Sequence, residues 1–259
     1  MSQTKLGSVV SSFVARAGNN PRLRKILDEV LEDEQARDLI LHRLGTLQMH
    51  NDQRIDLEMP QRAKPENFED LIWLLSSNYA NRGLALLMLE EAVWLYDTIQ
   101  QLGSPDVAEL GRAKGGTTFL MAAAGAKVLS LENGKLEAMH ERVGGKSEVS
   151  YDDALRNALD SAGLSDRVET VVADAETYPV IQDTYDLVFV DIALPDDREK
   201  RLFDRWWPGV KPGGRLVLRD GREPRTPSVQ SLAASLMEKP DLIIDATSPG
   251  VFVVLERMA

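Results

Sequence analysis

Four acidic side chains lie at or near the ends of short apolar runs in the second half of the chain: Glu109, Glu132, Asp174 and Asp191. Glu132 follows Gly111 by 21 residues, a spacing at which an acid accepts hydrogen bonds from ribose hydroxyls. Asp174 begins a short polar site suited to an adenine amino group. Four carboxylates around one site would repel a pyrophosphate. The pattern therefore predicts a nucleoside ligand that carries positive charge.

The loop after the first apolar run is rich in glycine and has the sequence GRAKGGTT from Gly111 to Thr118. Glycines let backbone N–H groups approach a ligand closely, and the start of the following helix favours anionic groups. The loop matches neither of two common nucleotide-binding motifs. Ala113 replaces a glycine of the dinucleotide motif, and Thr117 replaces the lysine of the phosphate-binding P-loop.

The elements that position these residues follow from hydrophobic patterning. Short apolar runs that alternate with helical patterns predict right-handed crossovers and a parallel sheet, and their continuous hydrophobicity indicates that both faces are covered. The last two runs are separated by too few residues for a crossover helix, which predicts an antiparallel hairpin. We therefore expect an α/β fold with a doubly wound, mostly parallel, Rossmann-like sheet of seven strands. The expected strands are Val107–Leu110, Lys127–Leu131, Val168–Val172, Leu187–Asp191, Arg215–Leu218, Leu242–Ile244 and Val251–Leu255, and the clearest helices Thr117–Ala124, Asp153–Ala162 and Arg198–Trp207.

Before residue 104 the apolar residues recur at helical spacing without β-branched runs. The segment from Gly83 to Ile99 is apolar almost all round, so we expect a buried helix that Gly103 caps. This change from helical spacing to short apolar runs near residue 103 predicts two domains. They are an N-terminal helical cap or lid, residues 1–103, and a ligand-binding domain, residues 104–259. We expect the cap to cover the ligand site and to pair two copies as a homodimer. Residues 134–150 form an insertion, either a flap or a longer solvated helix.

Composition narrows the class of protein. The chain has no cysteine, three histidines and a net charge of −11, so disulfides, cysteine-bound metals and a thiol nucleophile are excluded. The acidic balance disfavours a nucleic-acid partner. From its segment lengths and composition we expect neither a membrane span nor a signal peptide. We expect a cytoplasmic protein with neither nucleic acid nor membrane as a partner.

The pieces VAELGRAKGGTT, KVLSLEN, AGLSDRVETVVADAE, YDLVFVDIA and VKPGGRLVLRDG stand in an order that resembles the class I S-adenosylmethionine-dependent methyltransferases. The resemblance covers residues 105–256 and implies S-adenosylmethionine as cofactor, whose sulfonium charge suits the acidic site. Glu109 and the glycine loop would surround the methionine part, Glu132 the ribose, and Asp174 the adenine. The implied cofactor-binding residues are Glu109, Gly111, Lys114, Gly115, Gly116, Thr117, Glu132, Asn133, Asp174, Ala175 and Asp191.

Within that class the motifs are similar to small-molecule O-methyltransferases of the catechol or caffeoyl-CoA type and of the macrocin or cephalosporin-tailoring type. The resemblance implies transfer of a methyl group to a hydroxyl in small-molecule biosynthesis. It also implies a Mg²⁺ ion bound by Asp191, the expected catalytic residue, and by Asp220. The sequence departs from these families in two places. Gly221 stands where catechol-type enzymes carry a third metal ligand, and the usual lysine base after Asp191 is missing.

Several interpretations therefore stay open. Asp220 is either a metal ligand or the cap of the following loop. The basic cluster around Arg219, Arg222 and Arg225 is either a clamp for a substrate carboxylate or phosphate or, as we favour, a set of solvated arginines on an edge loop. The chain could also be a catalytically silent partner subunit with a methyltransferase-like fold. A nucleotide-dependent oxidoreductase is a further alternative, disfavoured by the missing dinucleotide motif.

Overall fold

We describe the fold from a computed structural model of the chain. The structure describes residues 59, 61–75, 84–135, 149–192, 198–222, 227–236, 242–245 and 248–258. The helical stripes predicted before residue 59 and most of the predicted insertion at 134–150 lie outside these residues. None of the described helices is both long and apolar enough to cross a membrane.

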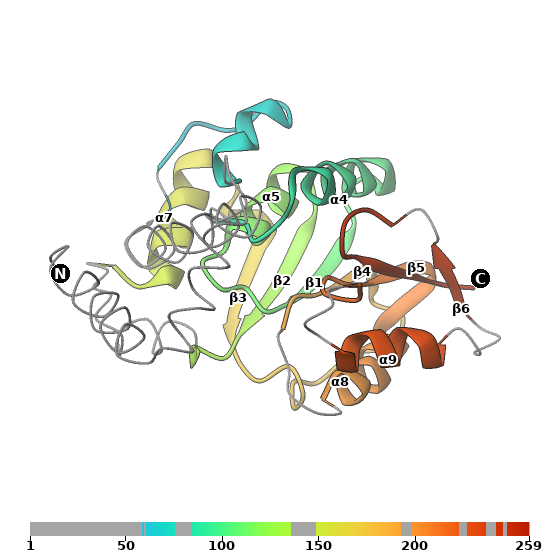
Figure 1. Cartoon of the computed structure of the whole chain (residues 1–259). Helices are drawn as coiled ribbons and strands as arrows, with labels where there is room; N and C mark the ends of the chain where they lie inside the picture. Colours follow the sequence, from blue (N-terminus) through green and yellow to red (C-terminus); the bar gives the residue numbers. More distant parts are fainter. Residues whose placement is uncertain are drawn as a thin grey trace, which may run out of the picture. The chain divides into compact units, whose positions relative to one another are not determined.

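A seven-stranded sheet with the order β3-β2-β1-β4-β5-β7-β6 forms the centre of the described part (Figure 1). The first five strands along the chain are parallel, and β7 is antiparallel to both of its neighbours. The predicted α/β class, the parallel sheet and the terminal antiparallel pair are thus confirmed. The strands are β1 (Asp106–Leu110), β2 (Lys127–Glu132), β3 (Val168–Val172), β4 (Tyr185–Val190), β5 (Val210–Leu218), β6 (Leu242–Asp245) and β7 (Val253–Arg257).

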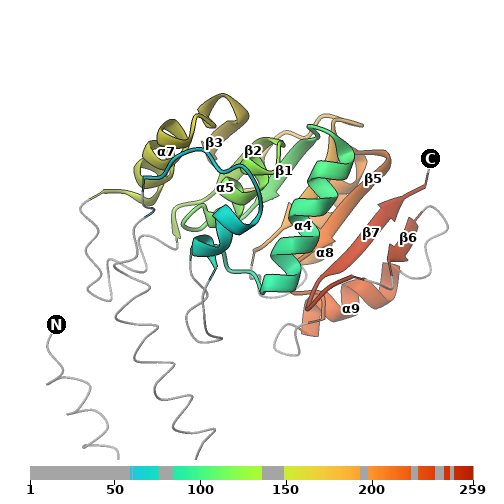
Figure 2. The ribbon, with the colours of Figure 1, turned by 90° about the horizontal axis from the view of Figure 1, so that it is seen from above.

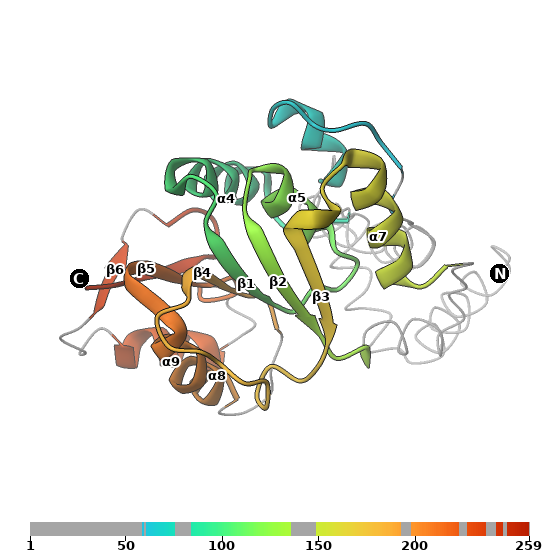
Figure 3. The same ribbon diagram turned by 180° about the vertical axis from the view of Figure 1, so that it is seen from behind.

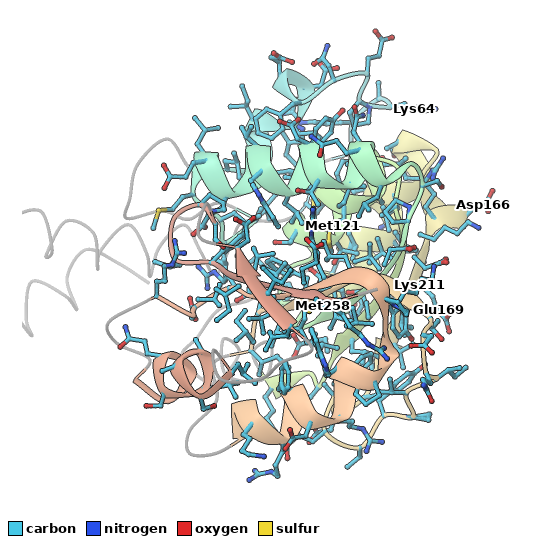
Figure 4. The ribbon with its side chains drawn as sticks, turned by 90° about the vertical axis from the view of Figure 1, so that its right-hand side faces the viewer. Lys64, Met121, Asp166, Glu169, Lys211 and Met258 are labelled. Atoms are coloured by element: carbon cyan, nitrogen blue, oxygen red, sulfur yellow. The ribbon has the colours of Figure 1, made fainter. Side chains whose placement is uncertain are left out.

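Helices cover both faces of the sheet, as the continuous apolar runs require. Three helices, α4 (Leu89–Leu102), α5 (Gly116–Ala123) and α7 (Tyr151–Ala162), pack on one face, and α8 (Arg198–Trp206) and α9 (Pro227–Leu236) on the other (Figures 1 and 3). Met121, labelled in Figure 4, is fully buried in the core of the first face. Short 3₁₀ turns complete the described elements: η1 (Glu69–Leu74), η2 (Ser165–Arg167) and η3 (Trp207–Gly209).

The α4 helix differs from its prediction at both its start and its burial. It begins at Leu89 instead of residue 83, because the Glu91 carboxylate accepts a hydrogen bond from the Met88 backbone N–H and caps the helix there. Ala92, Leu95 and Ile99 are buried, but Leu89 and Val93 are exposed, so the helix has one buried face. Gly103 caps its C-terminus at φ 68°, as predicted.

The described part of the predicted cap shares its core with the sheet. The backbone N–H groups of Leu84 and Ala85 both donate to the Leu74 carbonyl at 2.9 Å. Trp73 packs edge-on against Phe119 of α5 with ring centroids 5.5 Å apart. Figure 2 shows α4 and α5 lying over the strands from above. The segment from residue 84 also reaches the carboxyl ends of the strands, since the Leu86 carbonyl accepts a hydrogen bond from Arg219, directly after β5. The domain boundary at residue 103 stays a prediction.

Candidate functional site

A cavity of about 380 Å³ lies at the carboxyl ends of the parallel strands. Its walls include the ends of β1 and β4, where the strand order changes direction, the position at which open α/β sheets bind their ligands. Five acidic and two basic side chains line it, so negative charge predominates in its wall. The lining residues are Leu86, Gly111, Ala113, Leu131, Glu132, Asn133, Lys135, Ala173, Asp174, Ala175, Glu176, Asp191, Ile192, Leu202, Arg219 and Asp220.

Two glycines of the loop after β1 are required by close contacts. Gly111 has φ 97°, and a Cβ there would lie 2.2 Å from the Asp191 carbonyl oxygen. A Cβ on Gly116 would lie 2.2 Å from the Ala85 backbone nitrogen. Gly111 therefore lets the loop approach the end of β4, while Gly116 lets the N-terminal segment approach α5. Only Gly111 of these two lines the cavity.

Glu132 holds the glycine loop against the end of β2. Its Oε2 atom accepts a hydrogen bond from the Ala113 backbone N–H at 2.9 Å. Its Oε1 atom accepts from the backbone N–H groups of Asn133 at 2.9 Å and Gly134 at 3.2 Å. A carboxylate offers about four acceptor positions, so Glu132 keeps capacity for a ligand hydroxyl after these three bonds. Glu132 and Asn133 both line the cavity, where the sequence predicted them.

The loop after β3 is fixed by hydrogen bonds and by a buried indole. The Asp174 carboxylate accepts from the Glu176 backbone N–H at 3.0 Å. The Ala175 carbonyl accepts from the Trp206 indole N–H at 3.0 Å, and Trp206 is fully buried. Both Asp174 and Ala175 line the cavity. The loop thus presents a defined polar edge at the position predicted for the adenine.

Glu109 is placed differently from its prediction. It is fully buried, and the cavity lining does not include it. The alternation along β1 turns Glu109 toward α5, where its Oε2 atom accepts from the hydroxyls of Thr118 and Ser130, both at 2.5 Å. Burial raises the pKa of Glu109 to about 7, although the hydrogen bonds from Ser130 and Thr118 oppose the shift. The carboxyl is therefore a buried part of the fold behind the loop.

Four other predicted cofactor residues also lie outside the cavity lining. The ammonium of Lys114 lies 5.4 Å from the centroid of the Tyr151 ring, and the Lys114 side chain is buried. Thr117 is buried at the start of α5, next to Gly116 and close to the helix cap Gly115. The structure therefore brings seven of the predicted site residues together around the cavity: Gly111, Glu132, Asn133, Asp174, Ala175, Asp191 and Asp220.

Asp191 and Asp220, the predicted magnesium ligands, both contact a guanidinium. Arg219 Nη1 lies 3.1 Å from Asp191 Oδ1 and 3.4 Å from Asp220 Oδ1. Arg219 Nη2 donates to the Leu86 carbonyl at 2.5 Å. Burial alone would lower the pKa of Arg219, but the neighbouring carboxylates outweigh it and raise that pKa above its ordinary value. The predicted solvated arginine at position 219 is thus a buried cation in the cavity wall, whereas Arg222 is exposed.

The residues present do not fit a magnesium site. A bound Mg²⁺ needs carboxylate oxygens that face the ion, and here both carboxylates face a cation that does not lose its proton. The part of the chain that the structure describes contains no group of three or more His, Cys, Asp or Glu side chains able to hold a metal. The two carboxylates predicted to hold magnesium are thus already paired with a guanidinium.

Glu91, which sequence patterning did not single out, links the N-terminal segment to the end of the sheet. Its Oε1 atom accepts from the Val251 backbone N–H at 3.0 Å, before β7, while its Oε2 atom caps α4. Burial raises the pKa of Glu91, although both backbone hydrogen bonds and the charge of Arg219 oppose the shift. The only sequence signal was the acidic pair Glu90–Glu91 at a helix start.

Comparison with known proteins indicates which class of protein the chain resembles. Residues 108–221 match the methyltransferase domain family. A demethylmenaquinone methyltransferase from Clavibacter sepedonicus is 26% identical over 173 residues, which cover 64% of this chain and 63% of that protein. The match thus spans less than two thirds of that relative's length.

One solved structure supports the fold. A methyltransferase from Geobacter sulfurreducens is 17% identical, and the match covers 67% of this chain and 81% of that chain with a TM-score of 0.50. The O-methyltransferase TomG from Streptomyces achromogenes is 17% identical over 67% of this chain and 82% of its own, with a TM-score of 0.47. The family match and the sheet topology together make residues 108–221 a class I methyltransferase domain of the S-adenosylmethionine-dependent class. The resemblance predicted from the motifs is confirmed.

Proposed function

We propose that this protein transfers a methyl group from S-adenosylmethionine to a hydroxyl of a small molecule. The observation that carries the proposal is the acidic cavity at the change of strand order, bounded by Gly111, Glu132, Asp174 and Asp191. A negatively charged wall favours a cationic ligand over a nucleotide phosphate. The same charge pattern argues against the oxidoreductase alternative.

The residues around the cavity fit the cofactor. Glu132 would bind ribose hydroxyls, because it keeps acceptor capacity and is held in place by three backbone N–H groups. Asp174 and Ala175 would flank the adenine, and Gly111 leaves room at the loop for close approach. When bound, S-adenosylmethionine supplies a methyl group attached to a positively charged sulfur.

The end of the cavity formed by Leu86, Asp191, Arg219 and Asp220 would receive the methyl acceptor. Asp191 would take the proton that the hydroxyl loses when its oxygen bonds to the methyl carbon and the carbon–sulfur bond breaks. The walls would contribute chiefly by orienting the two reactants and excluding water. The cytoplasmic location, the small-molecule acceptor and the homodimer through the N-terminal helices remain predictions.

The name of the curated relative supports a second candidate acceptor, demethylmenaquinone. The two candidate acceptors give different methylated products. Mass spectrometry of reactions with demethylmenaquinone and with a panel of phenols, sugars and hydroxylated natural products decides between them. A protein that binds cofactor but methylates no compound supports the silent partner subunit instead.

Cofactor binding is tested by calorimetric titration of the full chain with S-adenosylhomocysteine, the demethylated product. We expect saturable binding to the wild type and a loss of affinity of about tenfold in Glu132→Gln, equivalent to about 1.4 kcal/mol. The matched control is Glu169→Gln, on β3 and outside the cavity lining; Glu169 is exposed and is labelled in Figure 4. A wild type that binds neither S-adenosylmethionine nor its product contradicts the proposed function.

A further inference from the structure

Arg219 occupies the space between the two carboxylates that the related metal-dependent enzymes would use for magnesium. Its Nη1 atom is within ion-pair distance of both Asp191, at 3.1 Å, and Asp220, at 3.4 Å. All three side chains line the cavity, at the end assigned to the acceptor. This inference rests on the proposed function, because it concerns how that site holds its reactants.

The guanidinium is fixed in this position. The Arg219 side chain is only 9% exposed, and its Nη2 atom donates to the Leu86 carbonyl. Turning the side chain away would break the hydrogen bond to this part-buried carbonyl and both ion pairs with the carboxylates. A guanidinium does not deprotonate in proteins, so the positive charge cannot be removed to admit a divalent ion. Arg219 and a metal ion therefore exclude each other here.

A second, independent observation concerns position 221, where the catechol-type enzymes carry their third metal ligand. A Cβ on Gly221 would lie 2.4 Å from Val253 Cγ2 and 2.6 Å from Val253 Cβ. These are fixed atoms of a β-branched side chain on β7, which has little freedom to move. The packing of β7 thus excludes a ligand side chain at position 221. The guanidinium of Arg219 and the packing around Gly221 therefore both disfavour a metal ion at this position.

We propose that methyl transfer in this protein needs no metal ion, and that Arg219 is the positioning residue that holds Asp191 and Asp220 in place of a divalent cation. The guanidinium supplies the positive charge between the carboxylates and fixes their orientation through directional bonds. The site then works without a Lewis acid to activate the hydroxyl. The proton of the acceptor passes to a carboxylate that Arg219 orients.

The test measures Mn²⁺ binding to the full chain in the presence of S-adenosylhomocysteine. Binding is detected as a decrease in the electron paramagnetic resonance signal of the free ion. We expect the wild type to leave the Mn²⁺ signal unchanged. Arg219→Ala removes the guanidinium that pairs with both carboxylates, so this variant should remove more Mn²⁺ from solution than the wild type does. Arg222→Ala is the matched control, because Arg222 belongs to the same basic cluster but is exposed and bonds the Ser248 carbonyl. It should behave as the wild type.

The outcomes separate the inference from the proposed function. Stoichiometric Mn²⁺ binding by the wild type that Asp220→Asn abolishes overturns the inference. So does a folded Arg219→Ala protein, judged by far-ultraviolet circular dichroism, that removes no more Mn²⁺ from solution than the wild type does. If Arg219→Ala does not fold, the wild-type titration decides alone. Failure of the wild type to bind S-adenosylhomocysteine, in contrast, removes the proposed function and leaves the Mn²⁺ result standing.

Discussion

Replacing Glu109 by glutamine should stabilise the protein more at high pH than at low pH. Burial raises the pKa of Glu109 to about 7 in the folded chain, whereas an unfolded glutamate titrates near 4.5. The folded state therefore binds this proton more tightly than the unfolded state does. Stability due to Glu109 is highest below pH 4.5 and is lost as the pH rises through 7. The full loss is about 3 kcal/mol, since one pKa unit corresponds to about 1.4 kcal/mol.

The Glu109→Gln variant removes this titration but keeps the shape of the side chain. Its amide oxygen can still accept from the hydroxyls of Thr118 and Ser130. Its NH₂ group replaces the Oε1 atom, which has no hydrogen-bond partner among the described residues. That unsatisfied group costs free energy at every pH, so it shifts the difference between the two proteins without changing its slope.

The assay is urea unfolding of wild type and variant from pH 5 to pH 8. We expect the stability of the variant relative to the wild type to increase by about 2 to 3 kcal/mol across this range. Other titrating groups cancel in the difference between the two proteins. For the exposed Glu169→Gln variant, the difference in stability from the wild type should not change with pH. If the stability difference between Glu109→Gln and the wild type is also independent of pH, Glu109 is not a buried carboxyl that binds its proton more tightly in the folded state.

Three further substitutions test the packing around the site. Gly111→Ala should cost about 1 to 3 kcal/mol more in thermal unfolding than Gly125→Ala, which has a positive φ but open space around it. Arg112→Met should destabilise by about 2 to 4 kcal/mol, because this buried guanidinium bonds a carboxylate and a strand carbonyl. The exposed Arg156→Met is its control and should change stability by less than about 0.5 kcal/mol. Trp206→Phe should cost about 1 to 3 kcal/mol and weaken S-adenosylhomocysteine binding in calorimetry, since it removes the indole bond that fixes the loop after β3, where we propose that adenine binds.

The sheet and the strand-end residues could be predicted because their signals are local. Five apolar runs separated by helical patterns, then two runs too close for a crossover, specify the strand directions, and the residue after each run lies at the same edge of the sheet. Glu132, Asp174 and Asp191 reach the cavity for this reason. Glu109 follows a different rule: it is inside β1, where alternation sends successive side chains to opposite faces. Its place in the strand, one residue before the end, directs it to the core.

The role of Arg219 could not be predicted from the sequence, because it depends on contacts between distant segments. Arg219 directly follows β5, and its partners are Asp191 after β4 and the Leu86 carbonyl in the N-terminal segment. Composition and spacing assigned it to a solvated edge loop, since arginines are usually exposed. Among the described residues, its partners from outside its own loop are Asp191 after β4 and Leu86 before α4.

The N-terminal part of the described chain contacts the proposed acceptor end of the cavity in two places. Leu86 contributes both a cavity wall and the carbonyl that fixes Arg219, and Glu91 ties the start of α4 to the Val251 backbone before β7. Leu86 before α4 and Glu91 in the first turn of α4 thus both bond to the end of the sheet at which Asp191 and Asp220 lie. Because buried ionic groups are costly to separate, a change that loosens either attachment should disturb the acceptor end of the cavity before the adenine end. The carboxylates of that end are thus paired with a cation that the protein carries itself, and one contact of that cation, the Leu86 carbonyl, comes from outside residues 108–221.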